Sequence, residues 1–437
     1  MTVGLVVLVL LAAIYGGSPN FRRPASDRLH PLGGDLLQEW VGGWMIRHGE
    51  VDRLYDSNRF DQLQHDPQVI GFEWDRAAYL PAVYPPYYYW IVSPLSCVPF
   101  PLAIWVWAGL LVSALLLGWS LTLRAVALCQ STALGGDDCS TRDRTWQLWC
   151  WWGIVPVLLM RPVIDSLTSS QKGPLLLLIL AAFLTLALRR KSLAAGVVAG
   201  LLVCKPQWLI VMVPWLIWRR EWRTLMGMTL TAAGLAGVAW WLSPDACLKY
   251  VDFLTHSANY IQTSGYESHL PRSTCWHGAW SLLWGSGTMT ARVLTVISAV
   301  ATLVVVGWGC RKPTESNGRL VLMREFSLVI LATCLVNPHL FAYDLTVLLI
   351  PLVYSLFILS DRPAQRLHRW WPLVGLWVVT GVAPDLARAT HLELTTIWLF
   401  VWLCWMAASP GRVSPLAEAA ERGKSLLELA ISGKTSQ

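Results

Sequence analysis

An acidic stretch early in the chain reads Gly33-Gly34-Asp35-Leu36-Leu37-Gln38-Glu39-Trp40, and a proline pair follows at Tyr84-Pro85-Pro86-Tyr87. A first apolar run over residues 3–16 precedes this region, and a long series of further apolar runs begins near residue 101. A polar region of this length in an otherwise apolar chain serves some purpose other than burial in a membrane. We therefore expect residues 17–100 to form a large first external loop with surface helices, and to carry much of the function.

The composition is that of a polytopic membrane protein. Of the 437 residues, 55% are hydrophobic and only 14% are charged, whereas soluble domains carry about 25% charged residues. The mean hydropathy is +0.47, and apolar runs recur from end to end, which leaves no room for a large soluble domain. Many of the 27 Trp residues lie at the ends of apolar runs, where an indole ring can anchor in the headgroup region.

Twelve apolar runs are candidate membrane-spanning helices, although several are shorter than the about 20 residues of a full crossing. They cover residues 3–16, 101–122, 146–160, 174–188, 193–204, 207–218, 224–242, 289–309, 324–337, 344–360, 370–386 and 394–408. The segment 87–99 is apolar but contains Pro94 and Pro99, so we expect it to be re-entrant or to lie on the membrane surface. The sequence thus predicts an all-α membrane domain over residues 1–410 and a cytoplasmic amphipathic tail over 411–437.

Short basic clusters predict the orientation of these helices. If the twelve runs alternate, one side of the membrane receives Arg189-Arg190-Lys191, Arg219-Arg220, Arg311-Lys312 and Arg362 to Arg369. The positive-inside rule makes that side cytoplasmic, and it accounts for the net charge of +7 without a nucleic-acid partner. The remaining polar clusters then gather on the other side, so we expect a multi-pass protein of the inner (plasma) membrane whose active site faces the outside or the periplasm.

Asp35 is the first candidate for catalysis. It precedes an apolar-periodic stretch, so its side chain could cap a helix. Alternatively it is a general base, which requires a carboxylate beside a dry cavity and an acceptor hydroxyl. Glu39 lies one helical turn later and would face the same way, either as a second candidate or as a solvated neighbour. The Tyr84-Pro85-Pro86 segment cannot begin as regular helix, and it is either a stiff return to the interface or an aromatic rim for a sugar or lipid.

Two lysines adjoin apolar runs, each beside an amide: Lys172 with Gln171, and Lys205 with Gln207. A charge at this depth is costly, so each ammonium either extends to the headgroups or holds a lipid phosphate. The sequence leaves both alternatives open.

The turn from Asn337 to Asp344 brings His339, Tyr343 and Asp344 together between two apolar runs, on the predicted external face. The loop 250–280 is polar and aromatic, which suits a carbohydrate but also an ordinary external loop. Walker A, GxGxxG, GxSxG and HExxH motifs are missing from the sequence, so nucleotide, NAD, serine-hydrolase and zinc-protease chemistry have no support. The ten Cys residues lack metal-binding spacing, although Cys247 and Cys275 share a predicted loop and could pair.

Together these segments resemble glycosyltransferase family 87 of the GT-C superfamily, which includes polyprenol-phosphate-mannose-dependent mannosyltransferases. The resemblance covers roughly residues 30–360, and the order of the motifs carries it. The motifs are Asp35 with Gly49 and Tyr55; Tyr84-Pro85-Pro86 with Pro94 and Trp105; Ser170 to Gly173; Ala195-Gly196 to Lys205-Pro206; Arg219 to Arg223; and Asn337 to Asp344. The Gln171-Lys172 pair departs from the Gly-Gln order that is usual in the family.

The resemblance implies a GT-C fold of about twelve transmembrane helices and an inverting transfer of a hexose, with mannose as the expected sugar, onto a lipid or glycan acceptor of the cell envelope. The donor would be a polyprenyl-phosphate-linked sugar, and since polyprenyl phosphate leaves readily, neither a metal nor another cofactor is expected. Asp35 would be the base; Lys205, Lys172 and His339 would hold the donor phosphate; Glu39, Tyr84, Gln171, Gln207, Tyr343 and Asp344 would contact substrate. The alternatives are a lipid or small-solute transporter or flippase, which would need charged spans and a symmetrical repeat, and a non-catalytic scaffold subunit.

Overall fold

The computed structural model describes residues 33–73, 79–134, 153–263, 270–311, 318–357 and 371–409. Over these ranges the chain is helical, and its only strand-like pairing is an isolated bridge between Ser273 and Phe341. The predicted all-α class is therefore confirmed. The expected first span over 3–16 and the tail over 411–437 lie outside the described residues.

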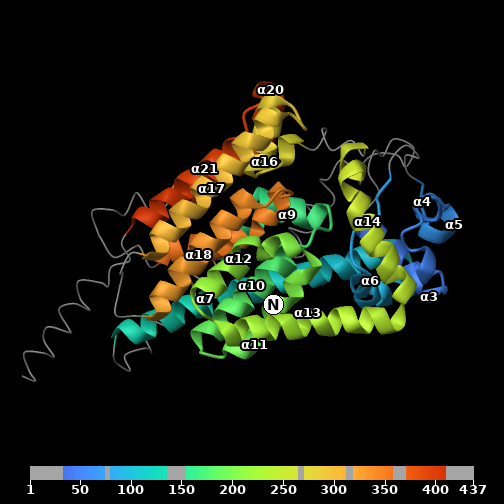
Figure 1. Cartoon of the computed structure of the whole chain (residues 1–437), viewed down its shortest axis with the longest axis horizontal. Coiled ribbons are helices and arrows are strands. Elements are labelled where there is room, and N and C mark those ends of the chain that lie inside the picture. Colours follow the sequence, from blue (N-terminus) through green and yellow to red (C-terminus); the bar gives the residue numbers. More distant parts are fainter. Residues whose placement is uncertain are drawn as a thin grey trace, which may run out of the picture.

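The described residues of the predicted first external loop fold into short helices at one end of the molecule, drawn in blue in Figure 1. In order they are α3 (Leu36–Arg47), η2 (Val51–Arg53), α4 (Ser57–Gln64), α5 (Pro67–Ile70), α6 (Pro86–Val92) and η3 (Ser93–Cys97). Helix α6 starts at Pro86 because a proline at the first helical position sacrifices no hydrogen bond. Helices α6 and η3 are both too short to cross a bilayer, in agreement with the expectation that 87–99 is not a full span.

The rest of the described chain forms a bundle of long and short helices. These are α7 (Phe100–Leu134), α9 (Arg161–Thr168), α10 (Gly173–Leu188), α11 (Ser192–Gly200), η4 (Leu201–Cys204), η5 (Pro206–Trp208), α12 (Leu209–Trp218), α13 (Trp222–Leu242), α14 (Pro244–Thr263), η6 (Leu270–Arg272), α16 (Trp276–Trp284), α17 (Met289–Arg311), α18 (Gly318–Val336), η7 (Ala342–Leu348), α19 (Leu349–Phe357), α20 (Trp371–Thr390) and α21 (Leu394–Ala408). Helix α7 runs from the short helices of the predicted first external loop into the bundle and α13 returns to end beside them, while α17, α18 and α21 lie obliquely at the other side of the bundle (Figure 1).

Fewer helices than expected are long enough to cross a membrane. Among the described residues, α7 over Phe100–Cys129, α13 and α17 qualify by length and hydropathy, and α9 with α10 would add a fourth if this pair, bent by 118°, is one broken span. Several other predicted spans fall on shorter apolar helices, including Ser192–Cys204 and Pro206–Trp218. About twelve crossings and the GT-C type therefore remain predictions.

The basic ends of several helices meet at one side of the bundle. Arg219 at the end of α12 pairs with Glu325 of α18 at 2.6 Å, and Arg311 at the end of α17 lies 5.4 Å from the centre of the Trp218 ring. Arg319 donates a hydrogen bond of 3.2 Å to the Leu128 carbonyl, which places the last turns of α7 there too. Arg219 and Arg311, two of the predicted cytoplasmic positions, thus lie at the same side, whereas Arg362 to Arg369 lie outside the described residues. The side of the membrane that they face stays a prediction.

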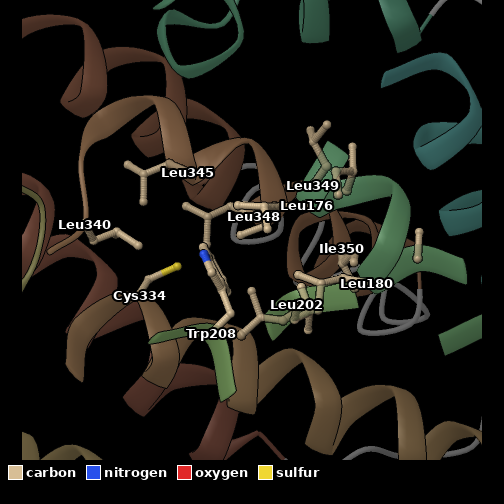
Figure 2. Close-up of a cluster of buried hydrophobic side chains, with 14 of the residues drawn as sticks. Leu176, Leu180, Leu202, Trp208, Cys334, Leu340, Leu345, Leu348, Leu349 and Ile350 are labelled. Carbon is tan, nitrogen blue, oxygen red and sulfur yellow. The ribbon is translucent and has the colours of Figure 1, made fainter. Parts of the chain in front are cut away.

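An apolar core holds the short helices η5 and η7, which lie next to the polar residues Lys205 and Asp344. Figure 2 shows Trp208 of η5 among Cys334 of α18 and Leu345 and Leu348 of η7, with leucines of α10 beside them. All of these side chains are buried. The packing holds η5 and η7 against each other, and the residues Lys205 and Asp344 lie at this junction.

Candidate active site

Asp35 follows a tight turn that packs on a distant part of the chain. Gly33 and Gly34 adopt left-handed φ values of +77° and +56°. A Cβ atom on Gly34 would lie 2.6 Å from the Ser169 carbonyl oxygen, so glycine is required for this close approach. Asp35 occupies the N-cap position of α3 but makes no side-chain capping hydrogen bond. The capping alternative is therefore wrong, and the carboxylate has another partner.

That partner is Gln171, whose Nε2 donates a hydrogen bond to Oδ2 of Asp35. Gln171 follows the sharp turn between α9 and α10, in which Ser170 has a φ of +53° and its carbonyl accepts 2.9 Å from Nε1 of Trp107. The other oxygen of Asp35, Oδ1, makes no hydrogen bond to any described residue, and the side chain is half-buried. One carboxylate oxygen is thus held in place while the other stays available.

Glu39 and Lys172 form a buried ion pair beside Asp35. The Lys172 ammonium binds Oε1 of Glu39, and the hydroxyl of Tyr88 donates to Oε2 at 2.5 Å. Glu39 is 0% exposed, and the Lys172 nitrogen also lies 3.8 Å from the centre of the Tyr84 ring. Both oxygens of Glu39 are consequently occupied, unlike those of Asp35.

Lys205 and Asp344 form a second buried ion pair, with 2.8 Å between Nζ and Oδ1. Lys205 comes from the break between η4 and η5, and Asp344 lies in η7, so the pair joins segments that are 139 residues apart. The ammonium also lies 5.6 Å from the centre of the Tyr343 ring. A single carboxylate oxygen engages only one of the three donors of an ammonium group.

Tyr84 lies among these charges. Burial raises the pKa of its hydroxyl well above the usual value, and the negative charges of Glu39 and Asp35 raise it further while Lys205 lowers it. Its ring contacts the Tyr88 ring at 4.5 Å between centroids, and its carbonyl accepts 2.7 Å from the hydroxyl of Tyr55. The Tyr-Pro-Pro segment therefore brings a neutral phenol and an aromatic wall to the two ion pairs.

The remaining predicted residues lie around this group in different ways. Tyr343 borders it through its ring, and its carbonyl accepts 2.8 Å from the Ser166 hydroxyl, which ties η7 to α9. Gln207 is half-buried two residues beyond Lys205 and hydrogen-bonds to none of the described site residues. His339 is exposed, and its ring stands edge-to-face on Phe341 at 4.8 Å.

Two readings of the sequence need correction. The lysines Lys172 and Lys205 do not extend to the headgroups, because both are buried and paired with carboxylates. Cys247 and Cys275 are free thiols and form no disulfide. Tyr88, which donates to Glu39, was not among the predicted site residues, and the only signal for it in the sequence is its place in the aromatic run that follows Tyr84-Pro85-Pro86.

Comparison with known proteins shows which protein family and which relative this sequence resembles. The sequence model of glycosyltransferase family 87 matches residues 82–338. An α-(1→3)-arabinofuranosyltransferase of Corynebacterium glutamicum is 27% identical over 207 residues, which cover 45% of this chain and 45% of that protein. The chain thus matches less than half the length of that relative. No solved structure matches the chain.

Proposed function

This chain belongs to glycosyltransferase family 87, and from this premise we propose that it transfers a sugar from a polyprenyl-phosphate-linked donor to a lipid or glycan acceptor. The transfer would invert the anomeric carbon and take place on the non-cytoplasmic side of the membrane. The donor sugar in this proposal is a hexose, with mannose as the first candidate.

The observation that carries the proposal is the difference between Asp35 and the other two acids of the site. Glu39 is fully buried, with both oxygens engaged, and Asp344 is held by Lys205. Asp344 also has one oxygen, Oδ2, without a hydrogen bond to a described residue, but its other oxygen is bound to a buried ammonium. Asp35 alone of these three is held by a neutral partner, Gln171, and its Oδ1 makes no hydrogen bond to a described residue. A general base needs an available lone pair and a fixed orientation, so Asp35 is the acid suited to this role.

In the proposed reaction, Oδ1 of Asp35 takes the proton of the acceptor hydroxyl. The acceptor oxygen forms a bond to the anomeric carbon, and the bond from that carbon to the phosphate oxygen breaks. Polyprenyl phosphate leaves with one additional negative charge, while Asp35 loses one. The total charge of the site is unchanged, and negative charge moves from Asp35 to the leaving phosphate.

Lys205 is the cation best placed to meet that charge. It is buried and gives one hydrogen bond to Asp344, so two N–H groups remain for phosphate oxygens. Lys172 lies over the Tyr84 and Tyr88 rings, at 3.8 and 4.9 Å from their centres, and also binds Glu39. Lys172 and His339 stay as secondary candidates for the phosphate.

A second candidate donor carries a pentofuranose in place of the hexose. It is favoured by the likeness to an arabinofuranosyltransferase. Membranes containing the protein should be offered polyprenyl-phosphate mannose and polyprenyl-phosphate arabinofuranose separately, each labelled in the sugar. Release of free polyprenyl phosphate from one of them identifies the sugar, and release from neither excludes both donors.

Asp35→Asn tests the base directly. The amide keeps the shape and can still meet Gln171, but it cannot take a proton, and general-base catalysis contributes about 10²–10⁴-fold. We expect normal expression and donor binding, with sugar transfer reduced at least about a hundredfold. Asp52→Asn, at an exposed acid of the same loop, is the matched control and should keep full activity. Near-normal turnover of Asp35→Asn would show that this residue is not the base.

A further inference from the structure

Helix α14 begins at an abrupt corner after the apolar helix α13. In Figure 1 it leaves the end of α13, and it packs beside η2 and α6 of the first external loop. The last residues of α13 are Trp240, Trp241 and Leu242, and all three are exposed, Trp241 to 82%. Exposed Trp at the end of an apolar span is typical of the boundary between hydrocarbon and headgroups. The exposed Trp residues of the corner are therefore those expected at that boundary.

The side chains of the first three turns of α14 sort into three sectors around the helix axis. With about 100° per residue, the exposed apolar residues Leu248, Val251 and Leu254 share one sector of about 120°. The exposed charged residues Asp245, Lys249 and Asp252 occupy the next sector. The least exposed residues, Ala246, Tyr250 and Phe253, share the third.

The third sector packs on the first external loop. The ring of Tyr250 lies 5.5 Å from that of Tyr55, and the ring of Phe253 lies 6.0 Å from it, between centroids. Lys249, at the edge of this sector, donates 2.6 Å to the carbonyl of Asp52. Since one side of α14 is covered by protein and a second side is charged, the exposed apolar sector requires an apolar environment of its own.

We propose that this apolar sector of α14 lies in the outer surface of the lipid bilayer, so that the helix is an interfacial anchor. Helix α13, which leads directly into α14, also exposes large apolar side chains, among them Leu230, Val238 and Trp241. A helix with separate apolar and charged faces at the end of a span is suited to the headgroup–acyl boundary. The contacts of α14 with Tyr55, and of Tyr55 with the Tyr84 carbonyl, then fix the height of the site relative to the membrane surface.

Photocrosslinking in the full-length protein tests this arrangement. A benzophenone amino acid is placed singly at Leu248 or Val251, and at Asp245 or Asp252 as matched controls from the same turns. The protein is reconstituted in vesicles of phosphatidylethanolamine and phosphatidylglycerol, irradiated and analysed by mass spectrometry. We expect several-fold more phospholipid adduct at Leu248 and Val251 than at the two controls. If one variant fails to fold, Leu254 replaces it on the apolar side and Lys249 on the charged side.

Equal amounts of lipid adduct on both faces, or none on the apolar face, would overturn the proposal. Adducts of Leu248 and Val251 with protein would also overturn it, because a second copy or another protein would then cover the sector. The experiment needs no sugar transfer, so its outcome is independent of the proposed reaction.

Discussion

Replacement of Glu39 by glutamine probes the buried pair with Lys172. Glutamine keeps the volume of Glu39 but removes its charge, which leaves the Lys172 ammonium buried without a counter-ion. Removal of one partner from a buried pair costs about 3–5 kcal/mol. The Tyr84 and Tyr88 rings remain over the ammonium and retain about 0.5–2 kcal/mol of cation–π attraction. We therefore expect Glu39→Gln to lower the free energy of unfolding by about 3 kcal/mol, the lower end of the range.

The double variant Glu39→Gln with Lys172→Met separates a pair effect from two unrelated losses. Lys172→Met alone leaves Glu39 as the buried charge, and we expect a comparable loss of stability. In the double variant neither charge remains, so the loss should be smaller than the sum of the two single losses by about 2 kcal/mol or more. Unfolding in mixed SDS–detergent micelles, followed by circular dichroism, measures all four proteins. Losses that add within about 0.5 kcal/mol would refute the pairing argument.

Three further changes have defined outcomes. Lys205→Ala should raise the apparent KM for the lipid donor roughly tenfold to a hundredfold, because a hydrogen bond to a charged group is worth about 1.5–3 kcal/mol. An unchanged donor KM and an unchanged rate would leave Lys205 with a structural role only. Gly34→Ala should lower the free energy of unfolding by more than Gly49→Ala does, as measured by the same unfolding in micelles. Both glycines have a positive φ, but only a Cβ atom at position 34 would meet a backbone atom. Equal losses of stability would contradict the close-packed turn. The hydrogen bond from Arg59 holds the pKa of Glu50 below its usual 4.5, so this pair stabilises the protein above pH 4.5, and the stabilisation is lost as the pH falls through the lowered pKa. The Glu50→Gln variant should therefore be less stable than the unaltered protein at pH 7 and should lose less stability on acidification. An unchanged dependence of stability on pH would exclude this contribution.

The helical fold and the meeting of distant polar segments could both be predicted from the sequence. The basic clusters predicted that the ends of α12 and α17 would lie on the same side, and Arg311 is indeed close to Trp218. The number of crossings could not be predicted with the same success. Runs such as 193–204 are apolar but form helices shorter than a full crossing, here Ser192–Cys204, and hydropathy does not reveal whether bent pairs such as α9 and α10 make one span.

The pairing of the charges was beyond the reach of the sequence. Glu39 and Lys172 are 133 residues apart, so no local pattern connects them. A lysine at the end of an apolar run looks the same in the sequence whether it extends to the headgroups or meets a buried acid. The choice depends on which carboxylate the fold brings close, and for Lys172 that choice rests on the Gly34 turn packing against Ser169.

The charges of the site also limit how the roles can be divided. Each buried lysine has a carboxylate of its own, since Lys172 has Glu39 and Lys205 has Asp344. A buried charge is tolerated only with such a partner, so a base in either pair would leave its lysine unpaired once it took a proton. Asp35, which is half-buried and bound to an amide, can become neutral without that penalty. In the proposed reaction the proton of the acceptor would therefore go to Asp35, and the negative charge would move to a leaving phosphate held by Lys205.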